Sequence, residues 1–152
     1  MKNRRSGDAG MKYDQAQVRI HEAYTVAIRD LGVHGEGIGS VDGFTVFVPG
    51  ALPGETVTVK ITLLKKSYAL GKLLSIEQES PFRTVPKCPA YENCGGCQLS
   101  HLTYEGQLDV KYRRVKDVIE RIAGESGDLV RPVLPAAHPF AYRNKMAVPA
   151  GL

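Results

Sequence analysis

The three cysteines of this chain, Cys88, Cys94 and Cys97, fall within ten residues of one another. Their C-x5-C-x2-C spacing, with Gly95 and Gly96 between the last two, lets a tight loop turn its sulfurs towards one centre. Thiolates prefer zinc, copper(I) or an iron–sulfur cluster to hard cations. Tetrahedral zinc and four-thiolate clusters need a fourth ligand, and the chain has no fourth cysteine. Either a histidine completes the site or the chain stops before the last ligand.

The composition of the chain is that of an ordinary globular protein. The 152 residues suffice for one domain or two small ones, with 43% hydrophobic and 24% charged side chains. No apolar run approaches the length of a membrane span, and the start of the chain lacks the apolar stretch of a secretory signal. An odd number of clustered cysteines without such a signal argues against a disulfide framework. We therefore expect a cytoplasmic protein with no membrane association.

The positive charge is modest and unevenly placed. The formal net charge is +4. Within residues 13–79 the basic groups gather late, at Lys60, Lys65, Lys66 and Lys72. Nucleic-acid binding requires such a localised basic face. The pattern is compatible with it, and a plain solvated surface remains the alternative.

Short strands separated by Gly- and Pro-marked turns dominate the first half of the chain. Residues 56–62 alternate polar and apolar side chains, which puts Val57, Val59 and Ile61 on one face. Several strands in so short a segment favour a small closed barrel of the OB type over residues 17–79, because closure removes exposed edges. Residues 1–16 are polar and predict a disordered tail. The four expected strands cover residues 24–28, 44–48, 56–62 and 68–76.

The glycine-rich run at residues 35–39 resembles a nucleotide-binding turn only superficially. Such a loop must open into a helix, and the residues that follow read as turn and strand. A bend or bulge of the barrel explains these glycines better.

The second half of the chain changes character after Pro81. Residues 82–100 predict an irregular cysteine loop that is not ordered without its metal, because it has few apolar groups to bury. A helix is expected over residues 102–123, ended by Gly124. Residues 130–134 and 142–148 look like strands, the last of them cut within a larger domain. One helix face carries the apolar residues Leu108, Tyr112, Val115, Ile119 and Ile122.

Two of these segments resemble a known family. Residues 32–39 and 46–55 resemble a TRAM domain, an OB-like RNA-binding barrel. The run from Cys88-Pro89 through Cys94-Gly95-Gly96-Cys97 to Lys111 is similar to the cluster segment of the bacterial 23S rRNA (uracil-5-)-methyltransferases. Residues 142–145 resemble the strand that opens the next region of those enzymes.

The resemblance implies a 4Fe–4S cluster held by Cys88, Cys94, Cys97 and a fourth cysteine from downstream. It also implies methylation of uracil C5 with S-adenosylmethionine, for which an attacking cysteine, a donor pocket and a base are required. The chain contains none of these, so we expect residues 80–152 to be the iron–sulfur segment and the start of a truncated catalytic region. The chain alone should be inactive, and S-adenosylmethionine should bind only the full-length enzyme.

Taken with the resemblance, the sequence predicts an α+β, mainly β chain: a TRAM barrel, a metal-binding loop, one amphipathic helix and the start of a further β region. We expect a monomer that binds 23S rRNA, with the target uridine left open. Two alternatives remain: a zinc module in which His101 joins the three cysteines, and a structural or protein-interaction fragment. The residues expected to contact RNA are Lys60, Lys65, Lys66, Tyr68 and Lys72.

Overall fold

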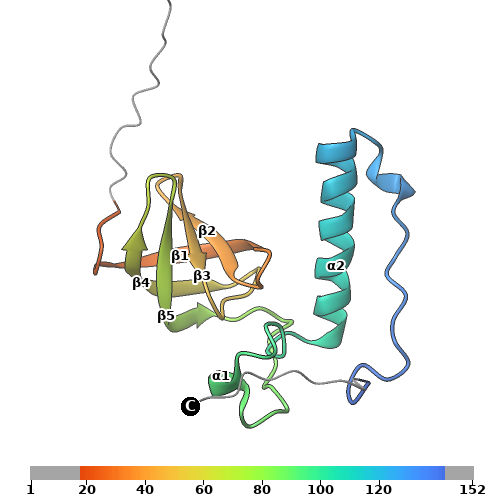
Figure 1. The fold of residues 1–152 in the computed structure, drawn as a ribbon. Helices are drawn as coiled ribbons and strands as arrows, with labels where there is room; N and C mark the ends of the chain where they lie inside the picture. Colours follow the sequence, from red (N-terminus) through yellow and green to blue (C-terminus); the bar gives the residue numbers. More distant parts are fainter. Residues whose placement is uncertain (1–17, 143–152) are drawn as a thin grey trace, which may run out of the picture. The chain divides into compact units, whose positions relative to one another are not determined.

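The computed structural model describes residues 18–142, which divide into two compact units (Figure 1). Of the described residues, the first unit contains 18–32 and 36–78, and the second contains 33–35 and 79–142. The expected tail at residues 1–16 lies outside the described residues, as does most of the strand expected at 142–148. No helix of the described part is both long and apolar enough to cross a membrane.

The first unit is a closed five-stranded barrel with the strand order β1-β2-β3-β5-β4. Neighbouring strands run antiparallel except for β3 and β5, which are parallel. Closure leaves no strand edge unpaired, as the sequence predicted. The strands are β1 (Ala23–Leu31), β2 (Gly37–Val41), β3 (Phe44–Val48), β4 (Thr56–Leu64) and β5 (Tyr68–Gln78).

The barrel core follows from the alternation of side chains along each strand. Val57, Val59 and Ile61 of β4 are fully buried, whereas Lys60 between them is exposed. Val46 and Val48 of β3 are fully buried in the same core. Each such side chain contributes about 1.5–3 kcal/mol through apolar burial. The prediction of a small, mainly β, OB-like barrel is confirmed.

The glycine-rich run forms a strand that the sequence did not predict. Gly37 and Gly39 lie in β2 and face the interior. A Cβ atom on Gly39 would lie 2.3 Å from Val26 Cγ1, and one on Gly37 would lie 2.9 Å from the Ala51 carbonyl oxygen. The glycines therefore let β2 approach the core closely. The expected bulge lies in β1, where the register shifts between Ile28 and Asp30 opposite β2.

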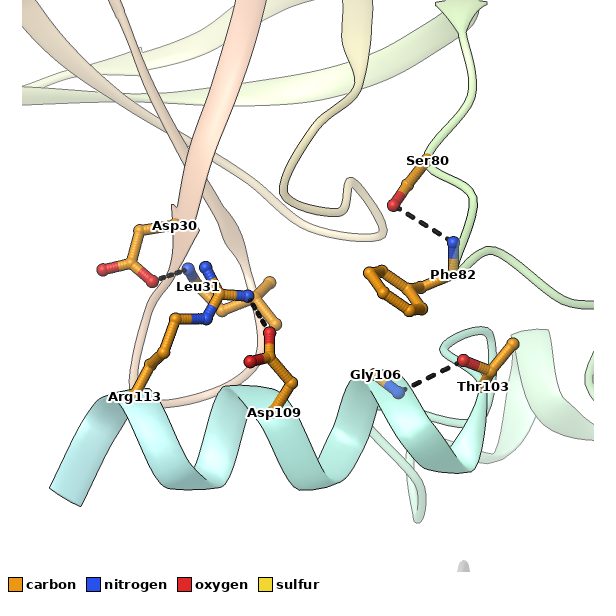
Figure 2. A network of polar contacts seen from close by, with 8 residues as sticks. All are labelled: Asp30, Leu31, Ser80, Phe82, Thr103, Gly106, Asp109 and Arg113. Carbon is orange, nitrogen blue, oxygen red and sulfur yellow. Dashed lines mark hydrogen bonds and ion pairs between the residues drawn. The ribbon is translucent and has the colours of Figure 1, made fainter. Parts of the chain in front are cut away.

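The second unit contains one long helix, α2 (Tyr104–Val118), continued by a π-helical turn, η1 (Ile119–Ala123). Thr103 begins it, because its hydroxyl accepts a hydrogen bond from the Gly106 N–H at 3.2 Å (Figure 2). Gly124 ends it in the left-handed conformation, with φ of 71°. The expected helix is confirmed, with its start two residues later. The two short helices are α1 (Tyr91–Cys94) and η2 (Gly127–Leu129).

The polar face of α2 carries ion pairs between residues one turn apart. Arg113 pairs with Asp109 at 2.5 Å (Figure 2), and Arg121 pairs with Asp117. Such exposed pairs contribute little stability, up to about 0.5 kcal/mol each. They mark this side of the helix as an ordinary solvated face. The apolar side is only partly covered, since Val115 is 50% exposed.

The strand predicted at residues 130–134 is wrong. This segment has no regular structure and runs back beside α2, where the Ala136 N–H donates to the Tyr104 hydroxyl at 2.6 Å (Figure 1). A strand needs a neighbour to pair its backbone groups, and no strand of residues 18–142 lies alongside this one.

Candidate RNA-binding face and cysteine loop

The outer surface of the barrel presents two aromatic rings from neighbouring strands. Residues directly opposite in a sheet share a face, and Thr45 pairs with Tyr68 while Phe47 pairs with Leu70. The rings of Phe47 and Tyr68 meet edge to face, with centroids 5.5 Å apart and planes at 86°. Phe44, by contrast, packs against the core. Tyr68 therefore belongs to an outward aromatic pair, which we call the aromatic pair below.

Basic side chains flank the aromatic pair. Lys60 of β4 lies directly opposite Lys72 of β5, and both are exposed. Lys65 and Lys66 form the turn between these strands and are exposed as well. Like charges placed opposite each other disfavour the sheet. The Lys60–Lys72 pair is thus costly for folding and well suited to a bound polyanion.

Arg29 is a further basic residue on the outer surface of the barrel, and the sequence did not point to it. Arg29 of β1 is exposed, and its guanidinium donates to the Ser40 hydroxyl on β2 at 2.5 Å. Ile38 of β2 lies opposite Phe47, so β2 continues the outer surface beyond the aromatic pair. No local signal marks Arg29, because strand pairing across the barrel determines its neighbours. The structure places the five predicted residues on one hairpin and adds Phe47 to them.

The cysteine loop of the second unit is closed at its base by backbone hydrogen bonds. The Thr103 N–H donates to the Phe82 carbonyl at 2.8 Å, and the Thr84 N–H donates to the His101 carbonyl at 2.9 Å. Arg83 and Leu102 form a β-bridge between these bonds. Two short stretches, 82–84 and 101–103, therefore form a stem that carries residues 85–100. The stem thus gives the loop a defined base, which the sequence did not predict.

The three thiols are free and exposed. No group of three or more His, Cys, Asp or Glu side chains in residues 18–142 is placed to hold a metal ion. The donor set nevertheless suits a soft metal or an iron–sulfur cluster. Gly95 turns the chain with φ of 67°, and a Cβ on Gly96 would lie 3.3 Å from the Cys94 sulfur. The glycine pair thus gives the sulfur room against the backbone, and the three thiols are the side chains that would hold such a group.

His101 lies inside the stem and not among the thiols. His101 is only 5% exposed, and its side-chain Nδ1 lies 2.5 Å from the Tyr91 hydroxyl. That hydroxyl also lies 3.3 Å from the Gln98 carbonyl. Burial raises the pKa of Tyr91, so the phenol keeps its proton at neutral pH. Sequence reasoning considered His101 only as a zinc ligand and missed Tyr91 altogether.

The amide of Gln107 ties the loop to the first turn of α2. Its Nε2 donates to the Leu99 carbonyl at 3.1 Å and to the Leu102 carbonyl at 2.9 Å. Gly106 beside it allows close packing, because a Cβ there would lie 2.8 Å from Leu102 Cδ1 and 3.0 Å from Phe82 Cβ. The stem therefore rests directly on the helix.

The observed barrel and a match to a known family model indicate the same type of domain. Residues 17–74 match the family model of the TRAM domain. The chain therefore contains a TRAM domain, as the resemblance in its sequence implied. The match supports the RNA-binding role that the resemblance implies for this barrel.

The similarity to known proteins extends beyond the barrel. An uncharacterized RNA methyltransferase of Bacillus cereus is 47% identical over 134 residues, which are 88% of this chain and 29% of that protein. A second uncharacterized RNA methyltransferase, from Halalkalibacterium halodurans, is 42% identical over 93% of this chain and 31% of its own length. The chain thus spans about three tenths of the length of these relatives.

Among solved structures, the crystal structure of Pyrococcus abyssi tRNA (uracil-54, C5)-methyltransferase with S-adenosyl-L-homocysteine is similar to this chain. The two are 28% identical, with a TM-score of 0.45, over 67% of this chain and 22% of the other.

Proposed function

We propose that this chain is the RNA-recognition and 4Fe–4S-binding part of an S-adenosylmethionine-dependent enzyme that methylates uracil C5 in 23S rRNA. The observation that carries the RNA-binding part is the aromatic pair on the outer surface of a TRAM barrel, flanked by four exposed lysines. Similarity to proteins named RNA methyltransferases supports the enzyme class. The parts of this proposal that name uracil, 23S rRNA and S-adenosylmethionine rest on the resemblance in the sequence.

The face would hold single-stranded RNA by two physical effects. Bases stack on aromatic rings, an interaction worth about 1–3 kcal/mol per base. Phe47 and Tyr68 are half-buried and offer part of their ring surface on the outside of the barrel. Phosphates are attracted by the lysines around it, and an RNA strand between Lys60 and Lys72 would relieve their mutual repulsion.

Charge reversal at the turn tests this face. The double variant K65E/K66E should weaken binding of single-stranded RNA and flatten its salt dependence, because fewer counterions are released. The slope of log K against log salt should fall by about 1.4 if both lysines contact phosphates of a single strand. The matched control R113E/R114E makes the same charge change on α2 and should have a smaller effect. An unchanged slope in the first variant, with a loss in the second, would move the RNA surface to α2.

The aromatic part of the face needs a separate variant. Tyr68→Ala should weaken RNA binding by about 1–3 kcal/mol, because one stacked base loses its platform. Tyr68→Phe keeps the ring and should bind nearly as tightly. Fluorescence anisotropy of a labelled oligonucleotide measures both variants. Equal losses in the two would assign the effect to the hydroxyl and contradict stacking.

The cysteine loop would hold the cluster through Cys88, Cys94 and Cys97, with a fourth ligand from outside this chain. When bound, the cluster would supply metal–thiolate bonds that cross-link an irregular segment. Protein purified without oxygen from a longer chain should be brown, absorb broadly near about 400 nm, and contain iron and sulfide. Stoichiometric zinc without iron would contradict the assignment and favour the three cysteines with His101.

A further inference from the structure

The cysteine loop is held in place by contacts that use none of its three thiols. The stem fixes its two ends, and Gln107 anchors Leu99 just after the last cysteine. These bonds leave the middle of the loop, where Cys88 and Cys94 lie, without support from the stem. The Tyr91 side chain reaches from this middle part back to the stem.

Tyr91 is connected to the neighbourhood of every cysteine. Its backbone N–H donates to the Cys88 carbonyl at 3.2 Å. It begins α1, whose last residue is Cys94. Its hydroxyl lies 3.3 Å from the carbonyl of Gln98, the residue that follows Cys97. A displacement of Tyr91 would therefore disturb the backbone at or next to all three cysteines.

His101 is the fixed end of this connection. Its backbone carbonyl accepts the Thr84 N–H in the stem, and the side chain is buried within the second unit. Its Nδ1 meets the Tyr91 hydroxyl at 2.5 Å, and the two rings are tilted by 42° with centroids 5.8 Å apart. A buried ring whose Nδ1 is occupied offers its protein partner a rigid anchor. The three thiols, in contrast, face solvent.

We propose that the Tyr91–His101 pair holds the backbone of the cysteine loop in shape independently of a metal, and that His101 acts through Tyr91 and is not itself a metal ligand. This inference concerns the loop to which the proposed function assigns the cluster. Here His101 holds Tyr91 in place, which differs from the role it would have in a zinc site of three cysteines and one histidine. In that site the imidazole would bind the metal, and the Tyr91 hydroxyl would be dispensable for the ligand set.

The first test uses the reduced, metal-free chain and needs no cofactor. Amide hydrogen exchange of residues 88–98 should become about tenfold faster in Tyr91→Phe, because the loop loses its partly buried hydrogen bond to His101. The barrel amides should exchange as before. Tyr104→Phe is the matched control, because it removes another tyrosine hydroxyl bond of the second unit, that to the Ala136 N–H. Equal exchange in the loop of Tyr91→Phe and of the unaltered chain would overturn the proposal.

Substitutions of His101 separate positioning from general packing. The side-chain amide of asparagine can donate to or accept from the Tyr91 hydroxyl near the place of Nδ1. His101→Asn should therefore restore most of the slow loop exchange that His101→Ala loses. If Asn and Ala variants exchange alike, the histidine only fills space and the proposal fails. Should His101→Ala not fold, Tyr91→Phe alone still decides the question.

A metal titration distinguishes the anchor from a ligand. Cobalt(II) added to the reduced chain reports thiolate coordination through its charge-transfer and d–d bands. In Tyr91→Phe and His101→Asn the affinity should fall about tenfold or less while the spectrum keeps its shape, because the ligands are unchanged. A changed spectrum in His101→Asn, with no effect of Tyr91→Phe, would make His101 a ligand. Slow loop exchange that depends on Tyr91, in a protein that takes up no iron, would contradict only the proposed cofactor.

Discussion

The two units of this chain are stabilised in different ways. The barrel buries a set of apolar side chains completely, among them Val26, Val57 and Val59. In the described part of the second unit, Leu102 is the one large hydrophobic residue buried to that degree, while Val85 and Ile122 are 86% and 80% exposed. Apolar burial thus holds the barrel, whereas hydrogen bonds and caps hold the cysteine loop and α2. A unit of the second kind gains most from a bound metal, because its own contacts are weak.

The sharpest test of this difference places the same charge in each unit. Val59→Asp puts an unpaired carboxylate in the barrel core and should remove more than about 4 kcal/mol of stability, enough to unfold the barrel. Val85→Asp makes the same change at an exposed site of the second unit and should leave the unfolding transition unchanged. Urea titration followed by circular dichroism measures both. A cooperative transition of ordinary midpoint in Val59→Asp would contradict the description of the core.

A buried carboxylate offers a second, smaller test within the barrel. Glu55 is 1% exposed, and its Oε2 accepts the Leu52 N–H at 2.8 Å in the connection between β3 and β4. Glu55→Ala should destabilise the barrel by about 1–3 kcal/mol, because a buried N–H loses its acceptor. Glu55→Gln retains an acceptor oxygen and should cost less. The change in urea midpoint measures both variants, and Glu125→Ala at an exposed site of the second unit is the control.

The second unit should respond to the loss of a single cap. Thr103→Ala removes the hydroxyl that accepts the Gly106 N–H, and should lower the local stability of α2 by about 1 kcal/mol. Hydrogen exchange of the first turn of α2 should become several times faster, while the barrel amides remain protected. Thr84→Ala is the control, because Thr84 serves the stem through its backbone N–H. Identical exchange in both variants would show that the cap is not what starts the helix.

The smallest expected effect is a pH dependence of the barrel. Hydrogen bonds from the Ser75 hydroxyl at 2.6 Å and the Thr58 hydroxyl at 2.9 Å hold the pKa of Glu77 below its ordinary value of 4.5. A lowered folded-state pKa means that this stabilisation is present above pH 4.5 and is lost as the pH falls through the folded value. Glu77→Gln should therefore make the unfolding midpoint less sensitive to acid as the pH falls below 4.5. The same acid sensitivity in the variant and the unaltered chain would remove Glu77 as its source.

The sequence predicted the barrel where the signal was local. Alternation along residues 56–62 identified β4, and turn residues marked its ends. The sequence did not predict β2, because three of the five residues at 37–41 are Gly or Ser and show no strand pattern. The role of Gly39, which lets the strand backbone pack closely against Val26, is visible only in the structure. The sequence also predicted strand structure at 130–134, where apolar residues have no described strand to pair with.

The candidate sites divide in the same manner. The lysines of the RNA face could be predicted, since they cluster along the chain around one hairpin. Alternation along the strand leaves open whether Phe44 or Phe47 faces outward, and the contact of Phe47 with Tyr68 depends on the parallel pairing of β3 and β5. The Tyr91–His101 contact follows no periodic pattern at all, since both residues belong to irregular or short segments. Its prediction would require the stem, which depends on tertiary structure.

The way the barrel closes also determines the order in which it can form. The pairs β1–β2, β2–β3 and β4–β5 join neighbours along the chain and need only short loops to close. The pairings of Ala23 with Lys60 and of Thr45 with Tyr68 bring together distant residues, whose loop-closure entropy must be overcome first. We therefore expect an early β1–β2–β3 meander and an early β4–β5 hairpin, followed by a slower joining step. During synthesis on the ribosome that step has to wait until β5 has emerged, so the edge of β1 that pairs with β4 is among the first parts to be made and among the last to find its partner.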